Sequence, residues 1–348
     1  MPDCAFLVPG DLALPTGGYT YDRRLLALLG SSGIDVAHIE LPASFPSPMP
    51  ADLARTAEIV ANLNNASVLF IDGLAYGAMP VDLLRSFSKP IVALCHHPLG
   101  YEAGLAPERA AALIASEKAA LAYADAVIVT SGETRASLVG DFDVPAARIT
   151  VAEPGVDPAP RARGTGSPVQ LLAVGSVVPR KAYGHLLSAL EGLAQFDWSL
   201  AIVGADDRHP DEPRRLRQII DDRSLAGRVT LAGAVDEVGL NRHYDAADVF
   251  VMTSLYEGYG MVLAEAMARG LPIVTSECGA AAARAPQTAA LKSAPGDVLA
   301  LRAALRRVIE DADLRQDMAR ASWVAGQQLP RWEETARTVA AVLRRIGA

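Results

Sequence analysis

The sequence has few cysteines, and they follow no pattern. Cys4, Cys95 and Cys278 lie far apart along the chain and form no CxxC pair. An odd number of scattered cysteines suggests neither a disulfide framework nor a cysteine-ligated zinc site. We therefore expect these three residues to be buried thiols.

Long apolar runs and an excess of positive charge are also missing. No run of about 18 uncharged apolar residues occurs, and the first ten residues, MPDCAFLVPG, contain no basic segment. The formal net charge is −8, whereas a protein that binds nucleic acid needs a basic face to displace counterions. We therefore expect a cytoplasmic protein with no transmembrane segment, at most peripheral contact with a membrane, and no nucleic-acid partner.

The sequence does contain enough apolar residues for two cores, since 51% of its 348 residues are hydrophobic. Short runs rich in Val, Ile and Leu alternate with longer amphipathic stretches, a pattern that predicts parallel sheets covered by helices. The runs are CAFLVPG, VLFIDG, IVALCHH, AVIVTS and RITVAEP before residue 165, and VQLLAVGS, SLAIVGAD, RVTLAG, DVFVMTS and LPIVTSE after it. The fold class is therefore α/β, with two doubly wound, Rossmann-like domains.

A Pro/Gly-rich segment over 157–168 is a poor candidate for helix or strand and is the expected hinge. We predict a first domain over 1–163 and a second over 164–331. Apolar residues at helical spacing in 332–348 predict a last helix that packs back on the first domain.

Two loops of the first domain contain candidate functional residues. Gly17 and Gly18 precede a helix, where backbone N–H groups can meet a ligand, although an ordinary strand-to-helix turn would use the same residues. His96 and His97 end an apolar strand and point to opposite faces, so they do not share a metal ion. For His96 a catalytic role and a structural role both stay open.

Two motifs of the second domain combine charge with apolar surroundings. Arg180 and Lys181 stand just before a helix, where cations oppose the helix dipole unless an anion binds; solvated loop charges are the alternative. Glu265 lies within an apolar helical stretch, eight positions after Glu257. A buried carboxylate needs hydrogen-bond donors, and vicinal sugar hydroxyls would supply two.

The spacing Glu-x7-Glu, preceded by Ser254 and followed by AMARGLPIV, resembles the signature of the retaining glycosyltransferases of the GT4 family, a group that includes glycogen synthases and mannosyltransferases. Further segments match in the same order: the Gly-Gly loop, the strand-end His, ADAVI with Ser131, EPGVD, the Arg-Lys loop and YDAADVF. The resemblance implies the GT-B fold, in which two Rossmann-like domains face each other across a cleft. It also implies that the first domain binds the acceptor and the second the nucleotide-sugar donor.

The resemblance assigns roles to individual residues. Glu257 would face the donor sugar, Glu265 would hold the ribose hydroxyls, and Arg180 and Lys181 would grip the diphosphate and act in catalysis together with Glu257 and His96. The remaining donor-binding residues would be Ser176, Ala234, Val235, Gly258, Tyr259, Gly260, Met261 and Val262. In the first domain, the residues near phosphate or acceptor would be Thr16, Gly17, Gly18, Tyr19, His97 and Ser131.

The chain departs from the family pattern in three places. Ser176 stands where an arginine is usual, Ala182 where a glycine follows the lysine, and 280–284 reads AAAAR where relatives often have a Gly-rich loop closed by Glu. Since the usual arginine is missing, we expect Arg180 and Lys181 to carry the diphosphate charge; Arg284 is the competing candidate.

The expected function is transfer of a sugar from a UDP- or GDP-linked donor to an unidentified sugar, lipid or small-molecule acceptor, with retention of anomeric configuration. The family needs no cofactor or metal ion for this reaction. A nucleotide-sugar epimerase on the same scaffold and a catalytically silent partner subunit are the alternatives. The sequence does not reveal the acceptor, the base, the sugar, the linkage or the oligomeric state.

Overall fold

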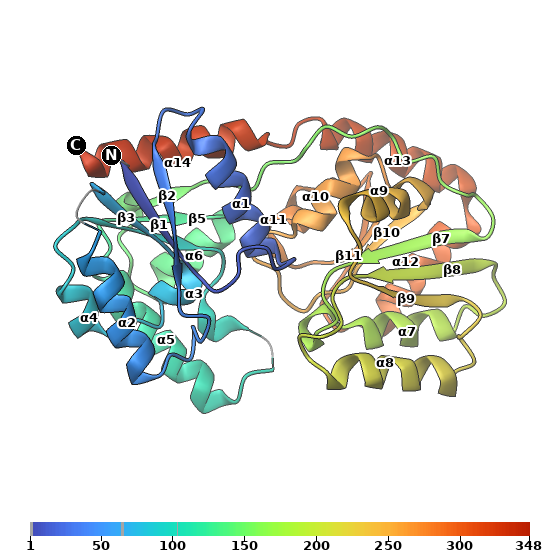
Figure 1. Cartoon of the computed structure of the whole chain (residues 1–348). Helices are drawn as coiled ribbons and strands as arrows, with labels where there is room; N and C mark the ends of the chain where they lie inside the picture. Colours follow the sequence, from blue (N-terminus) through green and yellow to red (C-terminus); the bar gives the residue numbers. More distant parts are fainter. Residues whose placement is uncertain (1–2, 64–65, 103) are drawn as a thin grey trace. The chain divides into compact units, whose positions relative to one another are not determined.

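The computed structural model describes residues 3–63, 66–102 and 104–348 and divides into two compact units. Unit 1 comprises Met1–Gly155 with Pro330–Ala348, and unit 2 comprises Val156–Leu329. Each unit contains one six-stranded parallel sheet with helices on its faces (Figure 1). Both sheets have the α/β character that the alternating apolar runs predict.

Unit 1 contains β1 to β6 in the sheet order β2-β1-β3-β4-β5-β6. Its elements are β1 (Cys4–Pro9), α1 (Gly17–Leu29), β2 (Val36–Leu41), α2 (Pro50–Ala61), β3 (Val68–Asp72), α3 (Gly73–Tyr76), α4 (Val81–Arg85), β4 (Ile91–Cys95), η1 (Leu99–Tyr101), α5 (Pro107–Leu121), β5 (Ala126–Val129), α6 (Gly132–Gly140), η2 (Ala146–Arg148), β6 (Ile149–Val151) and α14 (Trp332–Gly347).

Alternation along the buried strands of unit 1 divides the side chains between two faces. Leu69, Ile71, Ala93 and Cys95 join a core with α2, α4, α5 and α6. Their strand neighbours, such as Leu94, therefore point to the other face, against which α14 packs together with α1. Continued past the end of β4, the same alternation directs residue 96 toward the α1 face and residue 97 toward the α5 face.

Unit 2 contains β7 to β12 in the order β12-β11-β10-β7-β8-β9. Its elements are β7 (Val169–Val174), η3 (Pro179–Lys181), α7 (Tyr183–Glu191), β8 (Trp198–Val203), α8 (Asp211–Asp222), β9 (Val229–Gly233), α9 (Glu237–Ala246), β10 (Val249–Met252), α10 (Met261–Ala268), β11 (Ile273–Ser276), α11 (Gly279–Arg284), β12 (Ala290–Ser293), α12 (Val298–Glu310) and α13 (Ala312–Gly326). One face packs on α7, α8 and α12 and the other on α9 and α10. This strand order is that of a Rossmann fold.

Two strands, β2 and β12, are absent from the apolar runs found in the sequence. Both lie at the edge of a sheet, and β2 (VAHIEL) alternates polar with apolar residues because most of its side chains are only partly buried or exposed. The strand that ends in Cys95 is consequently the fourth of its sheet along the chain, not the third.

The division between the units lies earlier than the boundary expected after residue 163. Val156 is buried in the core of unit 2, the Ala162 N–H donates to the Arg269 carbonyl at 2.9 Å, and Arg163 forms an ion pair with Asp245. Residues 156–163 have no regular secondary structure and belong to unit 2. At the other end of unit 2, α14 belongs to unit 1, where Thr335 Oγ1 donates to the Glu153 carbonyl at 2.6 Å.

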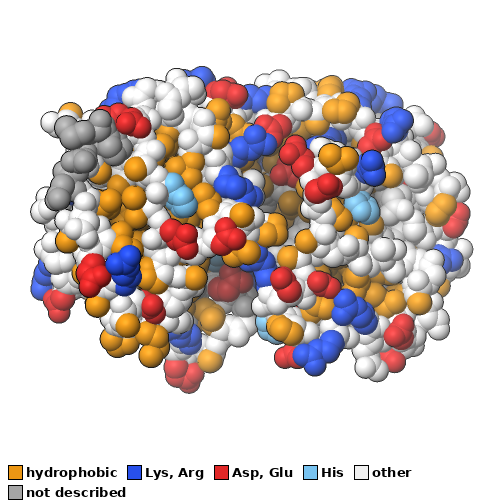
Figure 2. Space-filling model, in the orientation of Figure 1, with side chains coloured by type: hydrophobic (Ala, Val, Ile, Leu, Met, Phe, Trp, Pro, Cys, Tyr) orange, Lys and Arg blue, Asp and Glu red, His pale blue; other side chains and the backbone are white. Residues whose placement is uncertain are grey.

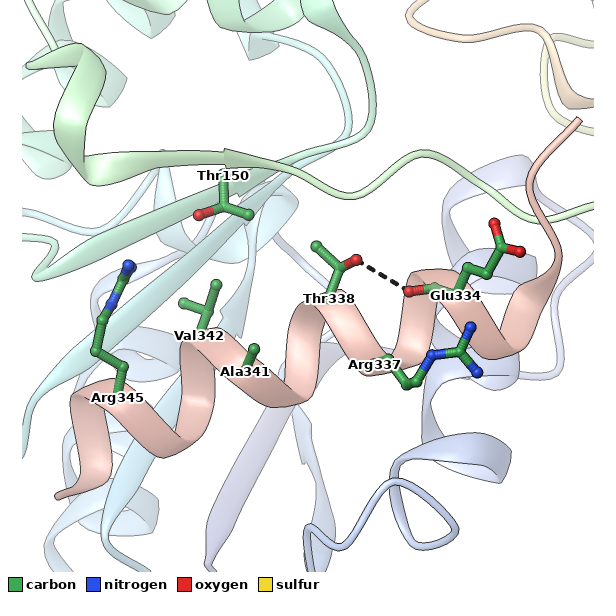
Figure 3. A pocket seen from close by; sticks show the side chains of 7 residues that line it. All are labelled: Thr150, Glu334, Arg337, Thr338, Ala341, Val342 and Arg345. Carbon is green, nitrogen blue, oxygen red and sulfur yellow. Dashed lines mark hydrogen bonds between the residues drawn. The ribbon is translucent and has the colours of Figure 1, made fainter.

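Charged side chains of both signs are interspersed over the face seen in Figure 2. Within the part of the chain that the structure describes, no helix has the length and apolar character needed to cross a membrane. A groove of about 550 Å³ runs between α14 and the edge strand β6. It is lined by Thr150, Glu334, Arg337, Thr338, Ala341, Val342 and Arg345 (Figure 3), and it includes none of the predicted site residues.

Candidate active site

Three of the predicted donor-binding residues of unit 2 meet where its strand order reverses. β7 pairs with both β8 and β10, so the loops after β7 and β10 leave the same edge of the sheet side by side. In open α/β sheets, ligands bind beyond the carboxyl ends of the strands at such a switch point. The loop after β7 contributes Arg180 and Lys181, and the loop after β10 contributes Glu257.

Three donors converge on one oxygen of Glu257. Lys181 Nζ contacts Oε1, Arg180 Nη1 lies 3.1 Å from it, and Ser254 Oγ donates to it at 2.7 Å. Glu257 is only 8% exposed. Burial alone would raise the pKa of this carboxyl, but Lys181 and Arg180 together with the Ser254 hydrogen bond lower it to about 2. Glu257 is therefore ionised at neutral pH and shares two cations.

Three hydrogen bonds to backbone carbonyls join the two loops. The Leu255 N–H donates to the Arg180 carbonyl at 2.9 Å, and Arg180 Nη1 donates to the Tyr256 carbonyl at 2.9 Å. Thr253 Oγ1 donates to the Lys181 carbonyl at 2.9 Å. These bonds fix the two loops to each other beside Glu257.

The loop after β11 supports Glu257 from a third strand. A Cβ atom added to Gly279, whose φ is +77°, would lie 2.6 Å from the Glu257 carbonyl oxygen, so this close approach requires glycine. The divergent AAAAR segment forms most of the short helix α11. Arg284 is the last residue of α11 and is exposed.

Glu265 has a different environment from the one expected. It lies in α10 but is only partly buried, and Tyr244 Oη donates to its Oε2 at 2.9 Å. The apolar neighbours in sequence pack into the core on the other side of α10. Tyr244 therefore supplies a hydrogen-bond donor to Glu265, whereas the sequence predicted that only the sugar hydroxyls would do so. The Glu265 side chain also remains partly exposed to solvent.

The other predicted donor residues lie in the loops after β7, β9 and β10 and at the start of α10. Ser176 is partly buried in the loop after β7, while Ala234 and Val235 are exposed in the turn after β9. The segment 258–262 leads into α10: Gly260 is its N-cap at φ +88°, and Met261 and Val262 are its first residues. Tyr259 is 5% exposed and packs in the core beside α10. Gly258 is partly buried.

Ala182 stands in a backbone conformation that glycine adopts at less cost. Its φ and ψ are 51° and 36°, in the left-handed region, which costs a residue with a Cβ atom about 1–2 kcal/mol. The departure from the family pattern at this position therefore places strain directly after Lys181.

We expect Ala182→Gly to leave the free energy of unfolding nearly unchanged, because relief of strain offsets the lost methyl group and the added chain entropy. Ala189→Gly, in the regular helix α7 and fully buried, should instead destabilise by about 1 kcal/mol or more. Urea denaturation of both variants measures the difference. Equal losses would show that Ala182 is not strained.

The predicted residue His96 of unit 1 meets two carboxylates. His96 Nε2 lies 3.2 Å from Asp22 Oδ1, on α1, and 3.3 Å from Asp72 Oδ2, at the end of β3. Asp22 is fully buried and Asp72 is 2% exposed. The two aspartates, through charge and hydrogen bonds, outweigh the opposing effect of burial and raise the pKa of His96 to about 10.

The three ligand-type atoms of His96, Asp22 and Asp72 lie within 4.8 Å of one another. At these distances both carboxylates can accept a hydrogen bond from one proton on Nε2. The two acids therefore have a positively charged partner without a metal ion. That the reaction needs no metal stays an expectation from the family resemblance.

His97 pairs with Glu102, with 3.1 Å between its Nε2 and Glu102 Oε2. The N-terminus of α1 lies beside His96: a Cβ atom added to Gly18 would be 3.3 Å from His96 Cδ2. Thr16 caps α1 through the Tyr19 N–H at 3.0 Å, and Gly17 is exposed. Ser131 caps α6 and is fully buried, so its side chain has a structural partner in the Thr134 N–H.

A buried acid supports the loop after β4 from the α5 face. Glu117, on α5, is 2% exposed and accepts the Leu99 N–H at 2.7 Å, while Cys95 Sγ lies 3.8 Å from its other oxygen. Burial raises the pKa of Glu117 to about 8. The carboxyl is thus largely protonated at neutral pH and stabilises the turn that follows the two histidines.

Sequence reasoning assigned no role to Asp22, Asp72, Tyr244 or Glu117. Asp72 follows the apolar run VLFI, so its position at a strand end was a readable signal of the kind used for His96. Asp22 stands between Tyr21 and Arg23, and Glu117 between Ser116 and Lys118, inside helical segments that carry no such signal. Their function depends on which strand each helix covers.

Two family models match consecutive parts of the chain. Residues 45–160 match "Glycosyltransferase Family 4", and residues 168–311 match "Glycosyl transferases group 1". Over 292 residues the chain is 28% identical to the GDP-mannose-dependent alpha-(1-6)-phosphatidylinositol monomannoside mannosyltransferase of Mycolicibacterium smegmatis, covering 76% of the chain and 71% of that protein. The chain spans less than half the length of the first D-inositol 3-phosphate glycosyltransferases that it matches, at 32–33% identity.

Solved structures share the fold over nearly the full length of the chain. Sucrose-phosphate synthase from Thermosynechococcus elongatus superposes with a TM-score of 0.85 at 23% identity, covering 98% of both chains. Anabaena Alr3699/HepE, crystallised in complex with UDP-glucose, has a TM-score of 0.76 at 18% identity, covering 99% of this chain and 100% of that one. These likenesses establish the GT-B fold. The two consecutive family matches identify the chain as a glycosyltransferase of the GT4 family.

Proposed function

We propose that the chain transfers a hexosyl group from a UDP- or GDP-linked sugar to a sugar, lipid or small-molecule acceptor, with retention of anomeric configuration. One observation carries the proposal: Arg180 and Lys181 lie beside the buried Glu257 at the switch point of unit 2. A diphosphate fits the two cations, and the carboxylate is suited to accept hydrogen bonds from sugar hydroxyls.

In the proposed reaction the bond between the anomeric carbon and the diphosphate oxygen breaks, and a bond from that carbon to the acceptor oxygen forms on the same face. The acceptor proton passes to the leaving diphosphate. Arg180 and Lys181 stabilise the negative charge that develops on the leaving group. Since Glu257 already pairs with both cations, the donor diphosphate must share them with this carboxylate.

The relatives support a nucleotide-sugar donor and leave the base open. The mannosyltransferase named above is GDP-mannose-dependent by its name, and the HepE structure contains UDP-glucose. The exposed turn at Ala234 and Val235, which we propose to meet the base, offers backbone groups rather than a base-specific side chain.

Thermal unfolding with UDP, GDP, ADP and dTDP tests the proposal first. The correct nucleotide at about 100 times its Kd should stabilise by about 2.7 kcal/mol. Turnover of the matching sugar donor is then measured with and without acceptors. Transfer to an acceptor supports the proposal, epimerisation without one supports the epimerase, and binding without turnover supports a silent subunit.

A further inference from the structure

The inference concerns the buried cluster of His96, Asp22 and Asp72, and it rests on the proposed function. Three separate elements build the cluster: α1 contributes Asp22, the end of β3 contributes Asp72, and the end of β4 contributes His96. Thr130 Oγ1, after β5, donates to the His96 carbonyl at 3.0 Å. The imidazole is therefore fixed by side chain and backbone together.

Two carboxylates on one ring nitrogen determine its protonation. Ionised carboxylates only accept hydrogen bonds, so both can approach His96 Nε2 only if this nitrogen carries a proton. Asp22 Oδ2 has no partner among the described residues. Burial, against the lowering effect of His96, raises the pKa of Asp22 to about 7, so the ionised form of Asp22 depends on the positive charge of His96 beside it. The buried acids are thus best satisfied by a positive imidazolium between them.

The other charged or titratable groups near the cluster do not provide that positive charge. Arg23 acts on Asp22 from α1 but bonds to the Leu14 carbonyl and Thr20. The ring of Tyr21 meets the imidazole edge-on, and its burial raises the pKa of its hydroxyl well above the usual value. Cys95 and Glu117 contact each other on the α5 face of the sheet, and His97 pairs with Glu102.

The opposite side of the imidazole is available to a ligand. The Cδ2 and Nε2 atoms face Gly18 and the two aspartates, and Nδ1 makes no hydrogen bond to any residue the structure describes. The side chain is 21% exposed. In an imidazolium both nitrogens carry protons, so Nδ1 can donate a hydrogen bond but cannot accept one.

We propose that Asp22 and Asp72 are positioning residues that keep His96 protonated, so that during sugar transfer His96 donates from Nδ1 to a substrate oxygen as a fixed cation and never acts as a general base. A general base would need a free ring nitrogen near neutral pH. Because Asp22 and Asp72 keep both ring nitrogens of His96 protonated, no free nitrogen is available to accept a proton. The positive charge is already in place at the carboxyl end of β4 before the substrate binds.

The first test measures protonation without requiring activity. Nitrogen-15 NMR of the histidine rings, with His96→Gln to identify the His96 signals, should show His96 protonated from about pH 6 to 9. In Asp72→Asn the His96 pKa should fall by at least about 2.5 units, enough to remove about nine tenths of the imidazolium at pH 8.5. The amide oxygen introduced by this change can still cap α3, since Asp72 Oδ1 accepts the Leu74 N–H in the native protein. A neutral His96 at pH 7.5 in the unmodified protein would overturn the proposal, whatever the reaction proves to be.

The second test follows kcat against pH in Asp22→Asn and Asp72→Asn. Both variants should lose at least about tenfold at pH 8.5 and regain most of it near pH 6, where a free imidazole protonates by itself. His96→Ala should lose at least about tenfold at every pH, and His97→Ala less. Asp297→Asn, which alters a helix-capping carboxylate that accepts the Ala300 N–H, is the matched control and should match the unmodified enzyme.

Two outcomes of the second test contradict the proposal. A loss of kcat that is equal at all pH values would assign the aspartates a purely structural role. Activity that is abolished by a chelator and restored by a divalent cation would show that a metal ion occupies the place we give to the proton. If no transfer is observed with any acceptor, the proposed function fails while the NMR result still decides the protonation of His96.

Discussion

Removal of Lys181 is expected to lower kcat/KM by at least about a hundredfold, or about 2.7 kcal/mol at the transition state. Lys181 and Arg180 are the two cations that contact Glu257, and the Lys181 side chain is only 11% exposed. Loss of one cation leaves both Glu257 and the diphosphate underpaired in a poorly solvated site. Steady-state kinetics of Lys181→Met test this, because methionine keeps the apolar stem that packs on Gly175.

Three further variants test whether Arg180 or Arg284 carries the diphosphate charge together with Lys181. Arg180→Ala should cost a comparable amount, whereas Ser176→Ala should be mild. Arg284 is exposed at the end of α11, so Arg284→Ala should leave kcat/KM nearly normal. The opposite ranking of Arg180 and Arg284, at one ionic strength, would refute our assignment of the diphosphate charge.

The ion pair between Lys181 and Glu257 should also stabilise the fold. Lys181→Met should lower the melting temperature, because a buried carboxylate loses a partner, and the added change Glu257→Gln should recover part of that loss. Melting curves of the two single variants and the double variant measure the coupling. Additive losses would mean that Lys181 and Glu257 do not stabilise each other.

Glu257→Gln is expected to lower kcat by at least about a hundredfold while free nucleotide still binds. Glutamine can keep the Ser254 hydrogen bond, but it loses the charge that orders Lys181 and Arg180. Glu265→Gln should instead weaken nucleotide and nucleotide-sugar alike, since we propose that Glu265 holds the ribose. Calorimetric titration with UDP or GDP, next to kinetics, separates the two effects.

Tyr244→Phe is the matched control for Glu265. It removes the hydrogen bond at Glu265 Oε2 and leaves the carboxylate in place. If Tyr244→Phe weakens the nucleotide as much as Glu265→Gln does, the effect of Glu265 is structural. If Glu257→Gln and Glu265→Gln affect free nucleotide equally, the division of roles between the two carboxylates is wrong.

Much of the fold could be read from the sequence because strands buried on both faces need continuous apolar runs, as in VLFID and IVALC. The edge strand β2 was not predicted, because it is exposed along part of its length and has no such run. The Glu-x7-Glu spacing and the Arg-Lys pair could also be found, since both are local. The Pro/Gly-rich connection was recognised, but its boundary was not, because burial of Val156 in unit 2 is a property of packing.

The sequence by itself determined the fold class, the family and the chemistry-bearing residues of the loops, since each depends on local pattern. Only the tertiary structure decided which side chains meet. Arg180 and Glu257 are far apart in sequence and become neighbours because β7 pairs with β10. Asp22 and Asp72 reach His96 because α1 covers one face of unit 1 and strand alternation turns His96 toward that face. Strand order and helix placement are cooperative properties of the whole core, and no local segment encodes them.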